Sequence, residues 1–164
     1  MRGAGAHLVI RARRRLLRRR RLVARLVVAH CDARRDFVGH VGGDDFLILF
    51  QSSDWLERCR SIVDEFALEA RSLFDDTARQ AGGIHAEDRH GIQRFFPCTT
   101  LSMGAARIAP GLLRHAEEVA NLAAQAKHEA KQAACGIVVL DAATGRATCS
   151  PEPVRCSPCE AVAA

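Results

Sequence analysis

Two glycines and two carboxylates stand side by side in the tetrapeptide Gly42-Gly43-Asp44-Asp45. Adjacent carboxylates repel each other, so a turn that serves only to reverse the chain gains nothing from the second acid. A divalent cation, or a metal ion bound to phosphate, would relieve that repulsion, and glycine backbone would let a large ligand approach closely. These residue types therefore indicate a metal-dependent site for a phosphorylated ligand, with a solvated turn as the structural alternative.

The segments on either side must position this tetrapeptide. Short apolar runs at 37–41 and 46–50 flank it, and runs of this length separated by Gly and Asp predict a β-hairpin. Glycine takes positive φ without a steric penalty, which a tight reversal requires. We therefore expect a hairpin whose tip is residues 42–45.

Hydrophobic periodicity predicts the other elements. Apolar residues recur every three or four positions at 55–74, which is typical of an amphipathic helix packed on a sheet, and Asp54 with Glu57 resembles a capping box at its start. A patchy apolar stripe at 12–31 indicates an earlier helix. After residue 96 the pattern predicts a central strand at 99–107, an Ala-rich helix at 112–134 and a last strand at 136–140.

The polar stretch at 76–96 has two interpretations. The side chains of His85, Glu87, Asp88 and His90 could form a metal cluster, but their spacing matches no strong metal motif. Turn-forming residues at 88–91 favour a surface hairpin that reverses there.

Charge is divided unevenly along the chain. The 164 residues are 48% hydrophobic and 26% charged, as in one globular domain, and the net charge is +5. The first 31 residues hold ten arginines and no acid, so the remainder is mildly acidic. We therefore expect no nucleic-acid site on the domain itself, while an Arg-rich helix near the N-terminus leaves nucleic acid or an anionic surface open as an alternative partner.

Several common features of secreted and membrane proteins are missing from the sequence. No apolar run is long enough to span a bilayer, and the N-terminus does not read as a secretory signal. Seven irregularly spaced cysteines indicate reduced thiols rather than a disulfide framework, which favours a cytoplasmic location. Residues 141–164 lack periodicity, so we expect a disordered tail.

Residues 36–50 resemble the signature hairpin of the GGDEF family, the diguanylate cyclases, with Gly42-Gly43-Asp44-Asp45-Phe46 in place of G-G-[D/E]-E-F. A second similarity is the T-x-S-x-G pattern of Thr100, Ser102 and Gly104, on a strand that lies next to the hairpin in that family. The subgroup that the hairpin resembles most is the GGDEF module that follows EAL and CBS modules in longer proteins. The similarity runs over 22–140.

The resemblance implies a function. Members of the family bind GTP over two Mg²⁺ or Mn²⁺ ions, and two GGDEF subunits face one another to join two GTP molecules into cyclic di-GMP. By position, Asp44 would be a metal ligand and Asp45 the second catalytic carboxylate, while Gly42 and Gly43 would let the phosphates approach. Lys127 and Lys131 fall where the family has basic residues that reach the phosphates, although a favourable charge at a helix C-terminus explains them as well.

The chain also departs from the family. The family's first strand supplies another metal-binding Asp, and the segment after it reads guanine, but no acid precedes Asp32 here. The product-inhibition motif R-x-x-D that ends at Asp36 has Ala33 in place of Arg. We therefore expect a truncated domain that lacks its first strand and does not turn over GTP.

The expected fold class is α+β, a truncated palm-like (ferredoxin-like) sheet covered by helices. We divide the sequence into an Arg-rich arm at 1–21, which a shifted reading frame would also explain, a partial GGDEF domain at 22–140, and the tail at 141–164. The alternative functions are a non-catalytic regulatory or dimerisation module and, from another class, an Arg-rich nucleic-acid-binding protein.

Overall fold

The structure is a computed structural model that describes residues 6–11, 16–42, 45–88, 90–112, 115–133 and 136–150, with the backbone alone for 6–11, 16 and 17. Its helices and strands follow the order β1 (Ala6–Arg11), α1 (Leu16–His30), β2 (Phe37–Gly42), β3 (Asp45–Phe50), α2 (Trp55–Ala70), α3 (Asp76–Ala81), β4 (Gly83–Glu87), β5 (Gln93–Pro97), β6 (Ser102–Arg107), α4 (Ala116–Ala133), β7 (Ile137–Asp141) and β8 (Ala147–Ser150). A short 3₁₀ turn, Arg71–Leu73, follows α2.

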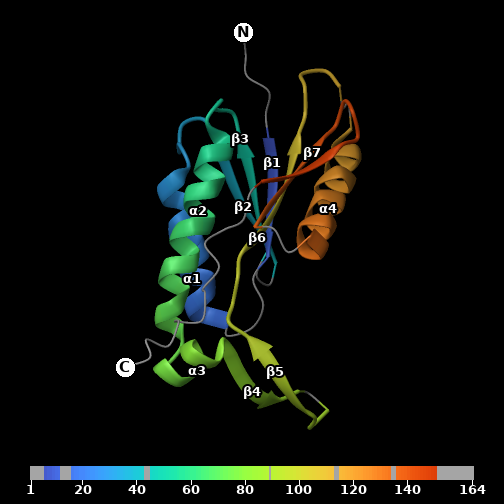
Figure 1. Cartoon of the computed structure of the whole chain (residues 1–164). Coiled ribbons are helices and arrows are strands. Elements are labelled where there is room, and N and C mark those ends of the chain that lie inside the picture. Colours follow the sequence, from blue (N-terminus) through green and yellow to red (C-terminus); the bar gives the residue numbers. More distant parts are fainter. Residues whose placement is uncertain are drawn as a thin grey trace, which may run out of the picture.

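A six-stranded sheet forms the centre of the molecule, with α1 and α2 on one face and α4 on the other (Figure 1). Its strand order is β2-β3-β1-β6-β7-β8. The β6–β7 pair is parallel and the remaining pairs are antiparallel. Strands β4 and β5 pair only with each other and extend away from the sheet, as the hairpin predicted at 76–96. The α+β class predicted from the sequence is confirmed.

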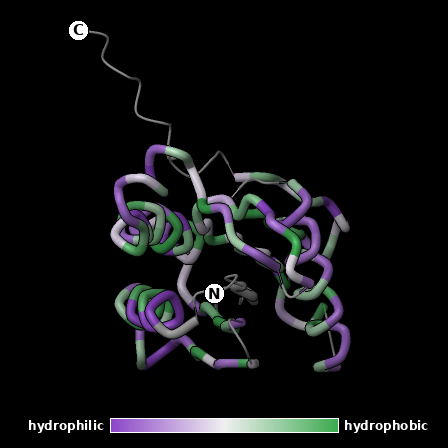
Figure 2. The backbone as a smooth tube through the Cα atoms, turned by 90° about the horizontal axis from the view of Figure 1, so that it is seen from below, coloured by the Kyte–Doolittle hydropathy of each residue, from purple (hydrophilic) through white to green (hydrophobic). Residues whose placement is uncertain are grey.

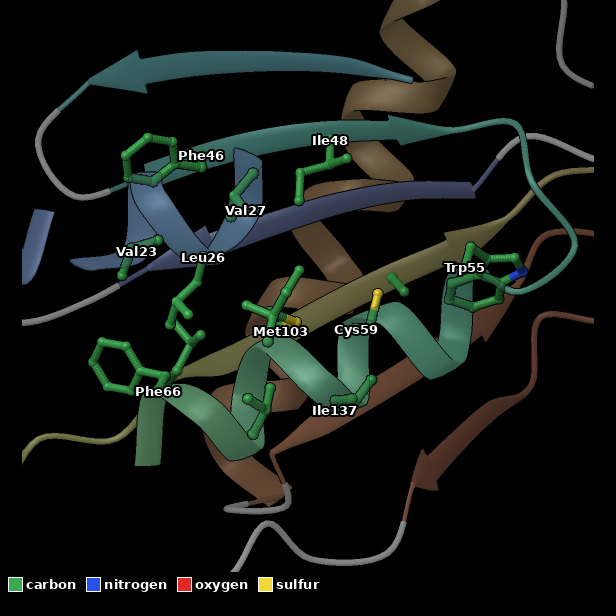
Figure 3. Close-up of a cluster of buried hydrophobic side chains, with 14 of the residues drawn as sticks. Val23, Leu26, Val27, Phe46, Ile48, Trp55, Cys59, Phe66, Met103 and Ile137 are labelled. Carbon is green, nitrogen blue, oxygen red and sulfur yellow. The ribbon is translucent and has the colours of Figure 1, made fainter. Parts of the chain in front are cut away.

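The main core lies between the sheet and the helices α1 and α2. Alternate residues of β3 face it, and Figure 3 shows them directed toward side chains from both helices and from β6 and β7. The largest fully buried side chains there are Phe50, Phe66, Leu26, Ile48, Ile62 and Met103. Burying one such side chain stabilises the fold by about 1.5–3 kcal/mol. Viewed from below, green hydrophobic segments run through the middle of the molecule and purple hydrophilic ones lie on outer turns (Figure 2).

The first strand is where the structure differs most from the sequence prediction. Strand β1 lies between β3 and β6 and pairs with both, so the expectation that the domain lacks its first strand is corrected. For the same reason the strand predicted at 99–107 is β6, separated from the hairpin by β1 rather than adjacent to it. The run Leu8-Val9-Ile10 has the composition of a buried strand, but the arginines around it dominate the sequence pattern.

Three smaller expectations also change. Asp54 makes no capping hydrogen bond and its carboxylate binds Arg58 instead. The stretch 141–150 is ordered, because an Asp141 turn leads into β8, which pairs with β7; residues 151–164 lie outside the described part. Cys149 is disulfide-bonded, so not all cysteines are the reduced thiols expected from their spacing.

In the described part of the chain, no helix is long and apolar enough to cross a bilayer.

Helix α4 lies against the sheet at backbone distance, and Gly104 of β6 makes this possible. A Cβ atom added at Gly104 would lie 2.2 Å from the backbone nitrogen of Lys127 and 2.3 Å from the carbonyl carbon of Ala126. Both obstacles are main-chain atoms of α4, which cannot rotate away. Gly104 therefore determines the distance between α4 and the sheet, and with it the position of the Lys127 backbone.

We expect Gly104→Ala to lower the free energy of unfolding by about 3 kcal/mol, because the methyl group forces α4 away from the sheet. The control is Gly39→Ala in β2, where the added methyl would meet the exposed Phe37 ring at 3.0 Å, which can move. Urea unfolding of both variants measures the difference. Equal stability of the two would show that α4 is not held by this contact.

Candidate functional site

The hairpin of β2 and β3 forms as predicted, with Gly42 opposite Asp45 at its end. The register shifts between His40 and Gly42, and Gly42 has φ of 136°, a value that favours glycine. A Cβ atom added there would have no neighbour within 4 Å. Gly42 is therefore required by the backbone conformation, not by packing, and the space beside it is open. Gly43 and Asp44 lie outside the described residues.

Asp45 faces α4, because residues on a strand alternate between faces and Phe46, Ile48 and Phe50 occupy the α1–α2 side. Its Oδ2 atom accepts a hydrogen bond from Lys127 Nζ at 2.6 Å. The side chains of Asp45 and Lys127 are each 22% exposed, so the ion pair is partly shielded from water. The other carboxylate oxygen, Oδ1, is buried and has no partner within the described part of the molecule.

The two lysines predicted to reach a ligand have different positions. Lys127 connects α4 to the hairpin, and Lys131, one helical turn later, has an exposed side chain near the end of α4. The structure thus brings together one lysine and one carboxylate of the predicted site. The sequence did not predict that they contact each other.

The strands beside Asp45 contribute no second carboxylate. Its cross-strand partner on β1 is Arg11, whose partner on β6 is Ser102. Strand β1 reads Ala-His-Leu-Val-Ile-Arg and contains no acid. No group of three or more His, Cys, Asp or Glu residues suited to a metal occurs among the described residues.

The small residues of the T-x-S-x-G pattern have a packing explanation at Gly104, since α4 fills the space above it. Thr100 is exposed before the strand, and Ser102 is half-buried at its start. Gly104 therefore affects the site indirectly, by placing the backbone of Lys127.

Asp36, the last residue of the altered R-x-x-D motif, is a structural anchor. Its side chain is fully buried (0% exposed), and its two oxygens accept the backbone N–H groups of Asp32 and Gln51, each at 2.9 Å. Arg58 of α2 lies 3.6 Å from the same carboxylate and donates to the carbonyl of His30 at 3.1 Å. Asp36 thus joins the end of α1, the hairpin and α2.

Two of the free cysteines, Cys31 and Cys59, are poor candidates for nucleophiles. Burial raises the pKa of the Cys31 thiol to about 11, and the nearby Asp36 carboxylate raises it further while Arg58 opposes this. Burial also raises the pKa of the Cys59 thiol, which lies in the core. A thiol in such surroundings stays protonated and unreactive near neutral pH.

A shallow hollow of about 390 Å³ lies at the end of the sheet remote from the hairpin tip. The guanidinium group of Arg107 lies 5.9 Å from the centre of the Trp55 ring, and Arg60 donates to Ser150 Oγ at 3.1 Å. Asp54 and Glu57 line the same hollow, so its charges balance and favour neither an anion nor a cation.

Comparisons with known proteins identify the fold. No protein-family model matches the sequence, and no curated protein is significantly similar to it. The GGDEF domain of DgcB from Caulobacter crescentus, solved in complex with c-di-GMP, is similar over 85% of this chain and 76% of that one, with a TM-score of 0.53 and 16% identity. Two structures of the GGDEF domain of PA1120 (YfiN or TpbB) from Pseudomonas aeruginosa give TM-scores of 0.48 and 0.46, identities of 18% and 21%, and coverage of 82% and 80% of this chain and of 74% and 76% of those. The chain has a GGDEF-like, palm-type α+β fold.

We expect Asp36→Ala to lower the free energy of unfolding by about 3 kcal/mol, because two backbone N–H groups and Arg58 lose their acceptor. Asp54→Ala is the matched control, since Asp54 also binds Arg58 but its side chain is 48% exposed. Urea unfolding should show a far smaller loss for the control. Comparable losses would mean that Asp36 contributes only a surface ion pair.

Proposed function

We propose that the chain is a GGDEF-type domain of cyclic di-GMP signalling, related to diguanylate cyclases, whose site does not catalyse the condensation of GTP. The GGDEF-like fold and the hairpin ending in Gly42 and Asp45 support the relationship. The observation that most directly supports the lack of catalysis is the ion pair of Asp45 with Lys127, in a sheet whose strand β1 has no carboxylate.

The residues present fit part of the metal requirement of a cyclase. Divalent ions bound there would neutralise the charge that develops on the phosphates and position them. Asp45 Oδ1, buried and without a described partner, is suited to holding one cation, and Asp44 would be its neighbour in the sequence. A second ion requires further oxygen ligands, and Asp45 Oδ2 already binds Lys127. The donor set therefore fits one ion and does not fit two.

For its ligands and partners, the proposal extends the resemblance to this chain. It implies Mg²⁺ or Mn²⁺ as the ion, GTP or cyclic di-GMP as the ligand, Gly43 as a further point of phosphate approach, and a second GGDEF subunit as the partner in catalytic relatives. Placement after EAL and CBS modules rests on the hairpin residues alone. The proposed cytoplasmic location rests on the cysteine pattern of the sequence, and the disulfide at Cys149 counts against it, because disulfides are uncommon in that compartment.

The basic helix α1 gives little support to the alternative of a nucleic-acid-binding arm. Arg19 is 6% exposed, Arg20 contacts His40, and Arg25 forms an ion pair with Glu69 of α2. Guanidinium groups engaged within the domain are less available to phosphates. The arginines at 13–15 lie outside the described residues.

The purified chain is expected to make no cyclic di-GMP from GTP with Mg²⁺ or Mn²⁺. Two carboxylates at most serve the metals, and misplacement of a bound substrate by about 1 Å costs on the order of a hundredfold in rate. Chromatographic detection of the product, with an active diguanylate cyclase as positive control, tests this. Turnover that disappears in the Asp44→Ala, Asp45→Ala double variant would refute the proposal, whereas weak nucleotide binding without turnover agrees with it.

A further inference from the structure

We propose that Lys127 competes with divalent metal ions for Asp45, so that its ammonium group occupies the position of a cation at the hairpin tip. The inference concerns the same carboxylate as the proposed function but needs neither GTP nor catalysis. It describes a cation site that the side chain of α4 keeps closed.

The first support is the geometry of the pair. Lys127 Nζ lies 2.6 Å from Asp45 Oδ2, slightly closer than the range of about 2.7–2.9 Å that is usual for a charge-assisted hydrogen bond between nitrogen and oxygen. A divalent ion bound to that oxygen would have to lie within about 2.0–2.6 Å of it, so the ammonium group and the ion cannot both occupy this position.

The second support is that the backbone of Lys127 has a fixed position. The close approach of α4 at Gly104 holds the backbone nitrogen of Lys127 against β6, and the same face of the sheet presents Asp45. A lysine attached to a rigid helix loses less freedom when it binds a carboxylate than one on a mobile loop. The pair is therefore a stable alternative to metal ligation.

The third support is the state of the second oxygen. Asp45 Oδ1 is buried and has no partner in the described part of the structure, and an unpaired buried carboxylate oxygen is costly. Lys127 thus neutralises the charge of Asp45 but does not satisfy both oxygens. Removing the ammonium group would leave a partly buried carboxylate with two unpaired oxygens, which is a better cation ligand than the paired form.

Binding of Mn²⁺ to the full chain, measured by electron paramagnetic resonance without nucleotide, tests the competition. We expect Lys127→Met, which keeps an aliphatic side chain of similar length, to tighten Mn²⁺ binding about tenfold, equivalent to about 1.4 kcal/mol. Adding Asp45→Asn to this variant should abolish the gain, because the carboxylate is then gone.

The matched control is Arg71→Met, which removes one positive charge at an exposed position at the end of α2. We expect it to change Mn²⁺ affinity less than twofold. Equal gains in Mn²⁺ affinity in the two variants would show that only the net charge matters and would overturn the proposed competition. Unchanged or weaker Mn²⁺ binding by Lys127→Met would overturn it as well. Lys127→Arg, which keeps the charge, serves as a second test if Lys127→Met fails to fold, and tighter binding by Lys127→Arg would also overturn it.

The outcome is independent of the proposed lack of turnover. A chain that makes cyclic di-GMP but shows the tenfold gain in Lys127→Met would refute the proposed function and keep the competition. A chain that is inactive but shows no gain would do the reverse.

Discussion

The arrangement of the candidate site depends on one steric constraint, the absence of a side chain at Gly104. Because β6 is bare at that position, the backbone of α4 comes within van der Waals contact of the sheet, and Lys127 begins directly above β6. From there its side chain reaches a carboxylate that is 82 positions away in the sequence. The pairing of the Asp45 charge at the end of the hairpin therefore depends on how α4 packs against a different strand, β6.

Local patterns were sufficient to predict the elements that carry their own periodicity. Several elements appear near their predicted bounds: the hairpin of β2 and β3, the amphipathic helix α2, the hairpin of β4 and β5, and the strands β6 and β7. Strand β1 was not predicted, since a short apolar run next to arginines carries a weak signal, and only pairing with β3 and β6 makes these residues a strand. Tertiary context overrides composition in such short segments.

The contacts between distant residues could not be predicted for a related reason. Nothing in the sequence near Arg58 indicates that it reaches Asp36, and nothing near Lys127 indicates Asp45, because both pairs depend on how helices cross the sheet. The family resemblance suggested a phosphate ligand for Lys127, and the structure adds that its ammonium group pairs with the Asp45 carboxylate. The residue types at the hairpin are therefore sufficient to recognise the fold, but they do not by themselves show which groups contact each other there.

The central position of β1 also bears on how the chain acquires its structure. Strands β3 and β6 do not touch each other, so the sheet remains two separate pieces until residues 6–11 fill the gap. Closing it requires residue 6 to meet both residue 50 and residue 107. Pairings over such long stretches of sequence have a high entropic cost of loop closure and slow the search for the native state. A ribosome must therefore release most of the domain before its earliest strand has both neighbours.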